Sequence, residues 1–390
     1  MESSEKYFFE LIQMGLFHRF VLSGTPNADE WAKVYDIANN QTLLGVLFPV
    51  IERLPQEQRP PRDILFSWYA SSCKIREMNK QLNTQVVSLY RGLSLKGVKS
   101  SVLKGQGVAL YYPDPMLRNP GDIDIWLTGG RKRVVSLLKK LDVDIGEIVY
   151  HHVDAFFFTD TDVEVHFRPT WLWNPIHNIR LQNWFDKVAP YQMANSVMIS
   201  EGGARIACPT RDFNAVFLLI HIYRHFFDEG IGLRQLMDYY YCIIRDGDNR
   251  YVVNLLKRFG LLRFASALMF VLHVVFGLPE EKFLVNPNAE YGELLLNEIM
   301  QAGNFGHFDV RMSRDCEVGS IANLKRKHSR NVQIRRLSPD EVFWECLSKY
   351  GIIFGVSSLT EKGHRYTAGF IGEFFPDFVA QKNILTWFGR

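Results

Sequence analysis

The stretch Gly121-Asp-Ile-Asp-Ile-Trp-Leu127 alternates acidic and apolar side chains, which is typical of a β-strand with one buried face. Side chains two residues apart on a strand project from the same face, so Asp122 and Asp124 are expected side by side, with Ile123 and Ile125 in a core. Two converging carboxylates repel each other unless a cation lies between them. Oxygen ligands of this kind suit Mg²⁺ or Mn²⁺, although a lone Asp-x-Asp pair is more often simply solvated.

A second alternating stretch, Val163-Glu-Val-His-Phe167, places Glu164 and His166 on one face. The residues Thr159-Asp-Thr-Asp162 join it to the apolar run Ile148–Phe158, and this turn chemistry predicts a β-hairpin. A third carboxylate on a neighbouring strand is what two-metal phosphoryl transfer requires. The alternative is an edge strand whose polar residues face water, and it is weaker because both patterns occur in one short unit.

The third motif, Leu103-Lys-Gly-Gln-Gly107, follows the strand-like stretch Val98–Leu103 and precedes a short helical run, Val108–Tyr112. Glycines at such a turn let backbone N–H groups approach phosphate oxygens, and a helix N-terminus favours an anion. Lys104 would add a positive charge to a triphosphate site. A plain strand-to-helix turn has the same pattern, so this motif is informative only beside the other two.

These motifs define the predicted fold. The order strand, helix, strand, helix, hairpin indicates a mixed sheet, and helical periodicity dominates on both sides of it. We therefore predict an α+β fold with a small mixed-sheet core over residues 97–203. Helical regions are expected over residues 1–96 and 204–390.

Composition restricts the class of protein. The 390 residues are 47% hydrophobic with a net charge of +3, which excludes general disorder and gives no global sign of nucleic-acid binding. The basic run Lys325–Arg336 is either a contact for a polynucleotide or polyphosphate or a solvated loop, and it lacks interleaved aromatic residues.

Cysteine usage and apolar runs bear on location. The five cysteines are scattered without metal-ligand or redox spacing, which predicts reduced thiols and a cytoplasmic protein. No secretory signal is expected at the N-terminus. The most apolar run, Phe264–Leu278, is too short to span a bilayer, so no membrane partner is predicted.

Three segments together resemble the uncharacterised nucleotidyltransferase family of the DNA polymerase β-like superfamily: Leu103-Lys-Gly105, Arg118-Asn-Pro-Gly-Asp-Ile-Asp-Ile125 and Val163-Glu-Val-His166. The resemblance implies that Asp122 and Asp124 are the metal pair and that Glu164 is the third carboxylate. It also implies that Gly105 is the glycine of the phosphate turn. The match is specific over residues 97–168. It is looser over the helical part, where it rests on His221-x-x-x-His225 and Gly232–Asp238.

The chain departs from the superfamily pattern in three places. Lys104-Gly105 stands where Gly-Ser or Gly-Gly is usual, and the segment from Gly105 to Asp122 is longer and contains three prolines. The third acid is Glu, not Asp, which gives a longer reach. The first two departures leave the manner of triphosphate binding open.

Several other residues have alternative interpretations. Arg118 would clamp a phosphate or be a solvated loop charge, and His166 would orient ligands or substrate. His151 and His152 lie on one strand, so alternation sends only one towards the site, with His152 a candidate for acid/base or phosphate contact. His221 and His225 have metal-ligand spacing on a helix but no evident third ligand, and Arg234 and Asp238 have ion-pair spacing.

The sequence therefore predicts a metal-dependent nucleotidyltransferase in which Asp122, Asp124 and Glu164 bind Mg²⁺ or Mn²⁺. Lys104, Gly105, Arg118 and His166 are predicted to contact the nucleotide or its phosphates. The predicted substrate is a nucleoside triphosphate, and the acceptor is expected to be a small molecule, a protein or an RNA. Two alternatives are a non-catalytic nucleotide-binding or regulatory protein with the same fold, and a helical metalloprotein centred on His221 and His225.

Overall fold

The computed structural model describes residues 2–17, 20–199, 203–306, 330 and 332–349. The N-terminal region is helical, as predicted, and comprises α1 (Ser3–Phe17), α2 (Ala28–Asn40), α3 (Leu44–Ile51) and α4 (Arg62–Leu95). The C-terminal region is also helical and comprises α8 (Arg211–Asp228), α9 (Leu233–Ile243), α10 (Asn249–Arg258), α11 (Leu262–Phe276), α12 (Ala289–Ala302) and α14 (Pro339–Lys349). The predicted helical segment beyond Lys349 lies outside the described residues.

A five-stranded mixed sheet lies between these helical regions, which confirms the predicted α+β fold. Its strands are β1 (Ser100–Leu103), β2 (Ile123–Leu127), β3 (Ile145–Ile148), β4 (His152–Ala155) and β5 (Val163–His166), in the order β1-β2-β5-β4-β3. Strands β2 and β5 are parallel, whereas the other neighbours are antiparallel. The pairing of β4 with β5 confirms the predicted hairpin.

Some elements of the α/β unit were not predicted. The run Ile148–Phe158 contains the end of β3, a turn and β4, and the turn was missed because no glycine or proline marks it. Helix α7 (Pro175–Ala194) and the small sheet of β6 (Ser196–Met198) and β7 (Arg205–Ala207) also form. The two helices predicted between the strands do form: α5 (Gly105–Ala109), which begins before the predicted run Val108–Tyr112, and α6 (Gly130–Lys140).

The two faces of the sheet have different neighbours. On one face, Ile123, Ile125 and Val165 are buried in a core that includes Leu82 and Val86 of α4. The opposite face carries Asp124, Trp126, Glu164 and His166 towards the C-terminal helices. This separation follows from the two-residue period of a strand and leaves the acidic side chains on the face opposite the apolar core.

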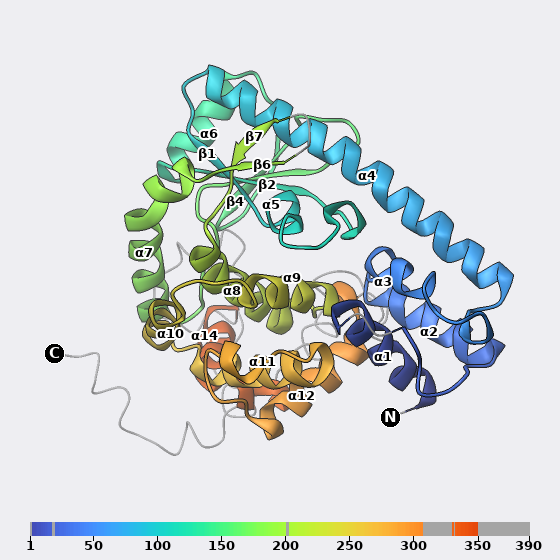
Figure 1. Cartoon of the computed structure of the whole chain (residues 1–390). Coiled ribbons are helices and arrows are strands. Elements are labelled where there is room, and N and C mark those ends of the chain that lie inside the picture. The colour runs from blue at the N-terminus through green and yellow to red at the C-terminus, as the bar shows by residue number, and fades with distance from the viewer. Residues whose placement is uncertain (1, 18–19, 200–202, 307–329, 331, 350–390) are drawn as a thin grey trace, which may run out of the picture.

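Helix α4 connects the N-terminal helices to the sheet (Figure 1). Its Trp68 lies in the larger core with α1–α3, whereas Leu89 lies in the core beneath the sheet. Between these ends, the Asn79 side-chain amide donates to the carbonyl oxygens of Met116 and Arg118, each at 2.9 Å. The helix therefore supports the proline-containing loop that precedes Asp122.

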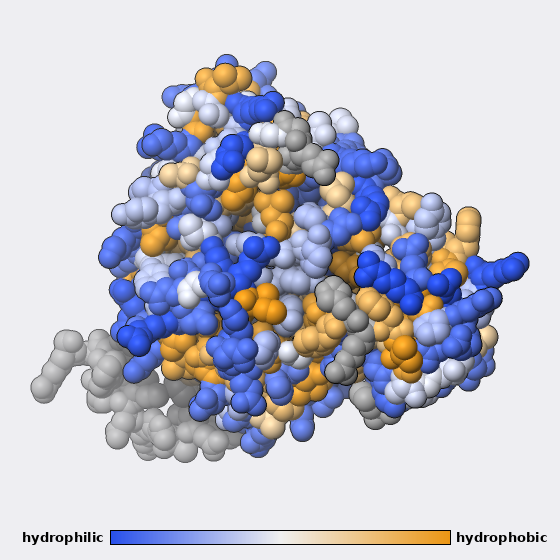
Figure 2. Space-filling model, in the orientation of Figure 1, coloured by the Kyte–Doolittle hydropathy of each residue, from blue (hydrophilic) through white to orange (hydrophobic). Residues whose placement is uncertain are grey.

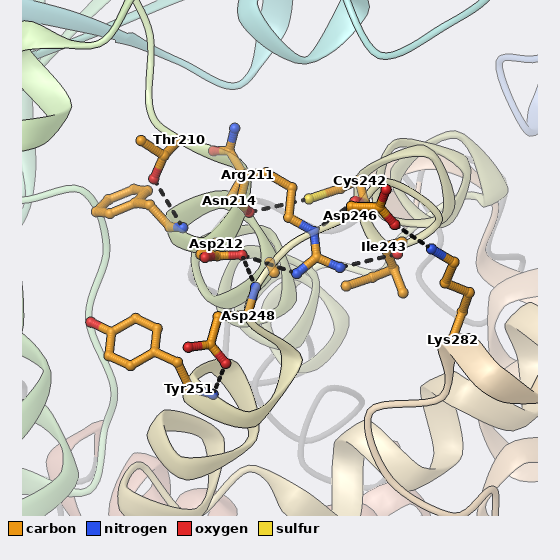
Figure 3. Close-up of polar contacts among 12 residues, drawn as sticks. Thr210, Arg211, Asp212, Asn214, Cys242, Ile243, Asp246, Asp248, Tyr251 and Lys282 are labelled. Atoms are coloured by element: carbon orange, nitrogen blue, oxygen red, sulfur yellow. Dashed lines mark hydrogen bonds and ion pairs between the residues drawn. The ribbon is translucent and has the colours of Figure 1, made fainter.

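Polar contacts tie α8, α9 and α10 together (Figure 3). The Arg211 guanidinium donates to the carbonyl oxygens of Cys242 at 3.1 Å and Ile243 at 3.0 Å. A cation at a helix C-terminus neutralises the partial negative charge of the last carbonyls. The Asp212 carboxylate accepts from the backbone N–H of Asp248 at 3.1 Å, which joins the start of α8 to the start of α10.

Hydrophilic and hydrophobic residues are mixed over the face shown in Figure 2. In the described ranges, no helix combines the length and apolar character needed to cross a membrane.

Trp126 connects the site-bearing face of the sheet to the helices. Its ring stacks on that of Phe213 of α8, with ring centroids 5.7 Å apart, and contacts that of Phe185 of α7, with ring centroids 6.2 Å apart. Trp126 is 3% exposed. Trp126→Ala should lower the free energy of unfolding by about 3–5 kcal/mol through lost burial and a residual cavity. Urea denaturation monitored by circular dichroism measures this change. Tyr191→Ala, at a side chain that is 72% exposed, is the control and should change stability little.

Candidate active site

The centre of the site is the carboxylate of Asp124, which is buried at 2% exposure. Its Oδ1 accepts from Lys104 Nζ at 2.9 Å and from His166 Nε2 at 2.8 Å. Asp122 lies just before β2 and is exposed on the same side of the sheet, where it lines one cavity together with Asp124 and a second together with Glu164. The two aspartates therefore differ: one carboxylate is neutralised by protein cations, and the other faces solvent.

Glu164 stands beside Asp124 because β2 and β5 pair in parallel with these two residues in register. His166 Nε2 also lies 3.2 Å from Glu164 Oε2, and His152 Nδ1 lies 3.3 Å from the same oxygen. The structure thus brings Asp124, Glu164 and His166 together, as the strand pattern predicts.

The charges of this cluster are strongly coupled. Burial opposes ionisation of Glu164, but the hydrogen bond from His166 and the charge of Lys104 lower its pKa to about 2. Burial also opposes the charged form of His166, yet its hydrogen bonds to Asp124 and Glu164 raise its pKa to about 9. The second ring nitrogen, Nδ1, lies 3.3 Å from the carbonyl oxygen of Arg168, so both N–H groups of an imidazolium have acceptors.

The turn after β1 brings Lys104 to this cluster. Lys104 has φ of +43° and Gly105 has φ of +38°, which is the left-handed region that favours glycine. A Cβ atom at Gly105 would lie 3.6 Å from the carbonyl oxygen of Asp122, so the turn runs close to the start of β2. This strained backbone at Lys104 brings the Lys104 ammonium group into contact with the Asp124 carboxylate.

The residues present fit a divalent cation. The ligand atoms of Asp124, Glu164 and His166 lie within 4.8 Å of one another, and Asp122 adds an oxygen donor to the same cavities. Lys104 and His166 now supply the positive charge that an ion would bring to Asp124. A set dominated by carboxylate oxygens suits Mg²⁺ or Mn²⁺.

Both His151 and His152 line the site, although strand alternation predicts only one of them there. His151 lies just before β4, outside the alternating strand, and its ring centroid is 5.3 Å from that of His166. Burial lowers the pKa of both His151 and His152, so each imidazole is neutral near pH 7.

Arg118 has a protein partner. Its Nε and Nη2 donate to the two carboxylate oxygens of Asp238 on α9, at 2.7 and 2.8 Å. The Tyr112 hydroxyl donates to the same carboxylate at 2.7 Å. Asp238 is therefore paired with Arg118 and not with Arg234, the partner that helical spacing offers. Arg118 lines the site, but its fork of donors is largely used within the protein.

His221 and His225 are neighbours on α8, with ring centroids 4.3 Å apart and ring planes tilted by 34°. Among the described residues, three groups of side chains could hold a metal ion, and none includes either histidine. Burial and the charge of Lys104 lower the pKa of His221, whereas His225 contacts Glu229 at 3.2 Å. The pair lines the cleft beside the carboxylates.

Two connected cavities meet at the carboxylates. A large cleft of about 920 Å³ extends from Asp122 and Glu164 to Trp171 and Arg224, whose guanidinium lies 3.7 Å from the Trp171 ring centroid. A narrow recess of about 50 Å³ continues to Arg234 of α9. Both are lined by Lys104, Gly121, Asp122 and His221. Sequence reasoning did not identify Trp171 and Arg224 as cleft residues, since no motif marks them.

The predicted basic run is only partly described. Lys325, Arg326 and Lys327 lie outside the described residues. Arg330 is buried and pairs with Glu298, and Arg336 pairs with Glu290 at 3.0 Å. These two arginines therefore have protein partners, and nucleic-acid binding by this run stays a prediction.

Comparison with known proteins identifies the class. Residues 27–277 match the family described as uncharacterised nucleotidyltransferase, and the chain therefore belongs to that family. A solved structure, an antigenic nucleotidyltransferase-like protein from Paracoccidioides brasiliensis, has 15% sequence identity and a TM-score of 0.30. That match covers 49% of this chain and 93% of the other. The comparison with curated proteins gives no match.

The charge cluster predicts a pH-dependent metal affinity. A cation bound at Asp124 and Glu164 removes the interactions that raise the His166 pKa to about 9, so binding should release a proton. Mn²⁺ affinity should therefore rise by up to about tenfold per unit between about pH 6.5 and 8.5, because fewer protons compete at higher pH. Isothermal titration in buffers of different ionisation enthalpy measures both affinity and proton release. In His166→Gln the pH dependence should largely disappear, and an unchanged pH profile in that variant would contradict this coupling.

Proposed function

We propose that the protein catalyses metal-dependent transfer of a nucleoside monophosphate from a nucleoside triphosphate to an acceptor hydroxyl, with release of pyrophosphate. The observation that carries the proposal is the register of β2 with β5, which sets Asp124 beside Glu164 next to the Lys104–Gly105 turn. Family membership supports the general reaction class.

Each group has a proposed task. Asp122, Asp124 and Glu164 hold the divalent cations, and the backbone at Gly105 together with Lys104 receives the triphosphate. His166 orients Asp124 and Glu164, to which it is hydrogen-bonded. Arg118 contributes mainly a positive charge near the phosphates. Its Nε and Nη2, which would form a bidentate contact with phosphate, already donate to Asp238.

The reaction forms a bond between the acceptor oxygen and the α-phosphorus and breaks the bond from that phosphorus to the bridging oxygen of pyrophosphate. Bound cations would lower the acceptor hydroxyl pKa and neutralise the leaving group. The hydroxyl proton passes to a base in the cleft. His152 is suited to this task because its burial favours the neutral imidazole, 3.3 Å from the Glu164 carboxylate.

The large cleft gives room for both substrates. Its volume of about 920 Å³ is within the range of small-molecule sites. The triphosphate would lie at the Lys104 end, and the acceptor would approach from the side of Trp171 and Arg224. The acceptor would be a small molecule, a protein side chain or an RNA end. We place the reaction in the cytoplasm, since buried Cys208 and Cys242 are free thiols.

Asp122→Asn tests the proposal. Asp122 is exposed, so the variant should keep the melting temperature of the wild type. Loss of a metal-ligand charge should reduce Mg²⁺-dependent transfer by about 10³-fold, as expected for several kcal/mol of transition-state stabilisation. Incubation with each α-labelled nucleoside triphosphate and a panel of acceptors, followed by separation of labelled products, measures the reaction.

Asp144→Asn is the matched control, because Asp144 is an exposed aspartate of the same α/β unit outside the cleft lining. It should transfer label at the wild-type rate. Retained turnover in Asp122→Asn would rule out the assigned metal pair. Nucleotide-dependent thermal shifts that need no metal, with no labelled product from the wild type, would instead support a non-catalytic nucleotide-binding protein.

A further inference from the structure

The recess beside the carboxylates is lined by an arginine whose donors are nearly unused. Arg234 lies in the first turn of α9. Among the described residues, its only hydrogen bond runs from Nη1 to the carbonyl oxygen of Asn119, at a long 3.4 Å. Its Nε is buried and has no partner there. A guanidinium has five N–H donors, so this half-buried side chain, whose Nε is fully buried, is largely unsatisfied.

Arg118, four residues before Asp122, provides the contrast. It lines the same recess, but Asp238 accepts two of its hydrogen bonds and Tyr112 completes the coordination of that carboxylate. A buried charge that is paired is a structural element, whereas a buried charge without a partner is costly unless a ligand satisfies it. The difference between the two arginines indicates that Arg234 is the one available to a ligand.

The charge balance of the recess specifies the ligand. Three cations line it, Lys104, Arg118 and Arg234, and three carboxylates oppose them, Asp122, Asp124 and Asp238. A divalent cation bound by Asp122 and Asp124 would leave a positive excess. Burial and the neighbouring charge of Arg118 already lower the pKa of Arg234, which shows how unfavourable the uncompensated cation is. An anionic group between Arg234 and the metal would restore the balance.

The geometry points to Arg234 as the anchor for a phosphate group of the nucleoside triphosphate, within the recess of about 50 Å³. This inference rests on the proposed function and deepens it. The Lys104–Gly105 turn contacts the triphosphate from the sheet, and Arg234 contacts it from α9. Arginine suits this task because its planar fork matches two phosphate oxygens. The substrate would thus bridge the α/β unit and the C-terminal helices.

Arg234→Gln, Arg234→Lys and the control Arg250→Gln test the inference, since Arg250 is exposed on α10. Without ligand, Arg234→Gln should melt at the wild-type temperature or above it, because the variant removes a half-buried charge whose Nε has no partner. Inorganic tripolyphosphate with Mn²⁺ is the probe, titrated calorimetrically. Arg234→Gln should bind it at least about tenfold more weakly than wild type, with Arg234→Lys intermediate. Arg250→Gln should bind as wild type does.

In the transfer assay, Arg234→Gln should raise KM for the nucleoside triphosphate more than it lowers kcat. Equal tripolyphosphate affinity in Arg234→Gln and wild type would overturn the inference and leave the proposed function standing. A lower melting temperature of Arg234→Gln without ligand, with binding restored in the folded fraction, would assign Arg234 a structural role and also overturn it. Failure of both wild type and Arg250→Gln to bind the probe would overturn the proposed function together with this inference.

Discussion

A buried carboxylate must be neutralised, and this requirement at Asp124 organises the α/β unit. Lys104 reaches it from a turn with left-handed backbone, and His166 reaches it from the neighbouring parallel strand. Both contacts require β1, β2 and β5 to pair in the observed register. The apolar residues that alternate with these polar ones fill the core on the other face, so the same pairing that completes the core also assembles the charge cluster.

A second buried pair, Arg118 with Asp238, relates the sheet to the helices. It joins the loop before β2 to α9, and Asn79 of α4 holds the same loop from the other side. The two walls of the recess on this loop and on α9 are therefore fixed to each other by hydrogen bonds, and α4 supports the loop from outside the recess. A ligand entering it meets a site whose shape exists beforehand, which reduces the cost of ordering the site on binding.

Local patterns in the sequence were sufficient to predict β2 and β5, which have a clear period of two residues, and the turn residues before β5 were sufficient to predict its hairpin. The sheet then brings together Asp124 and Glu164, as the two alternating motifs predict. Pairings over long separations were not predictable. Nothing in the sequence around Arg118 indicates that its partner is Asp238, 120 residues away. Likewise, α7 has no clear apolar stripe, and no glycine or proline in the run Ile148–Phe158 marks the turn between β3 and β4.

Helix α4 has a consequence for how the chain unfolds. With 34 residues it is about 51 Å long, and its two halves belong to different cores: Trp68 to the larger one and Leu89 to the one beneath the sheet. If either core unfolds together with α4, the other core loses the part of α4 that packs against it. A chain of 390 residues would ordinarily be expected to melt in separate steps. A shared helix of this length instead couples the N-terminal helices and the sheet into one cooperative unit.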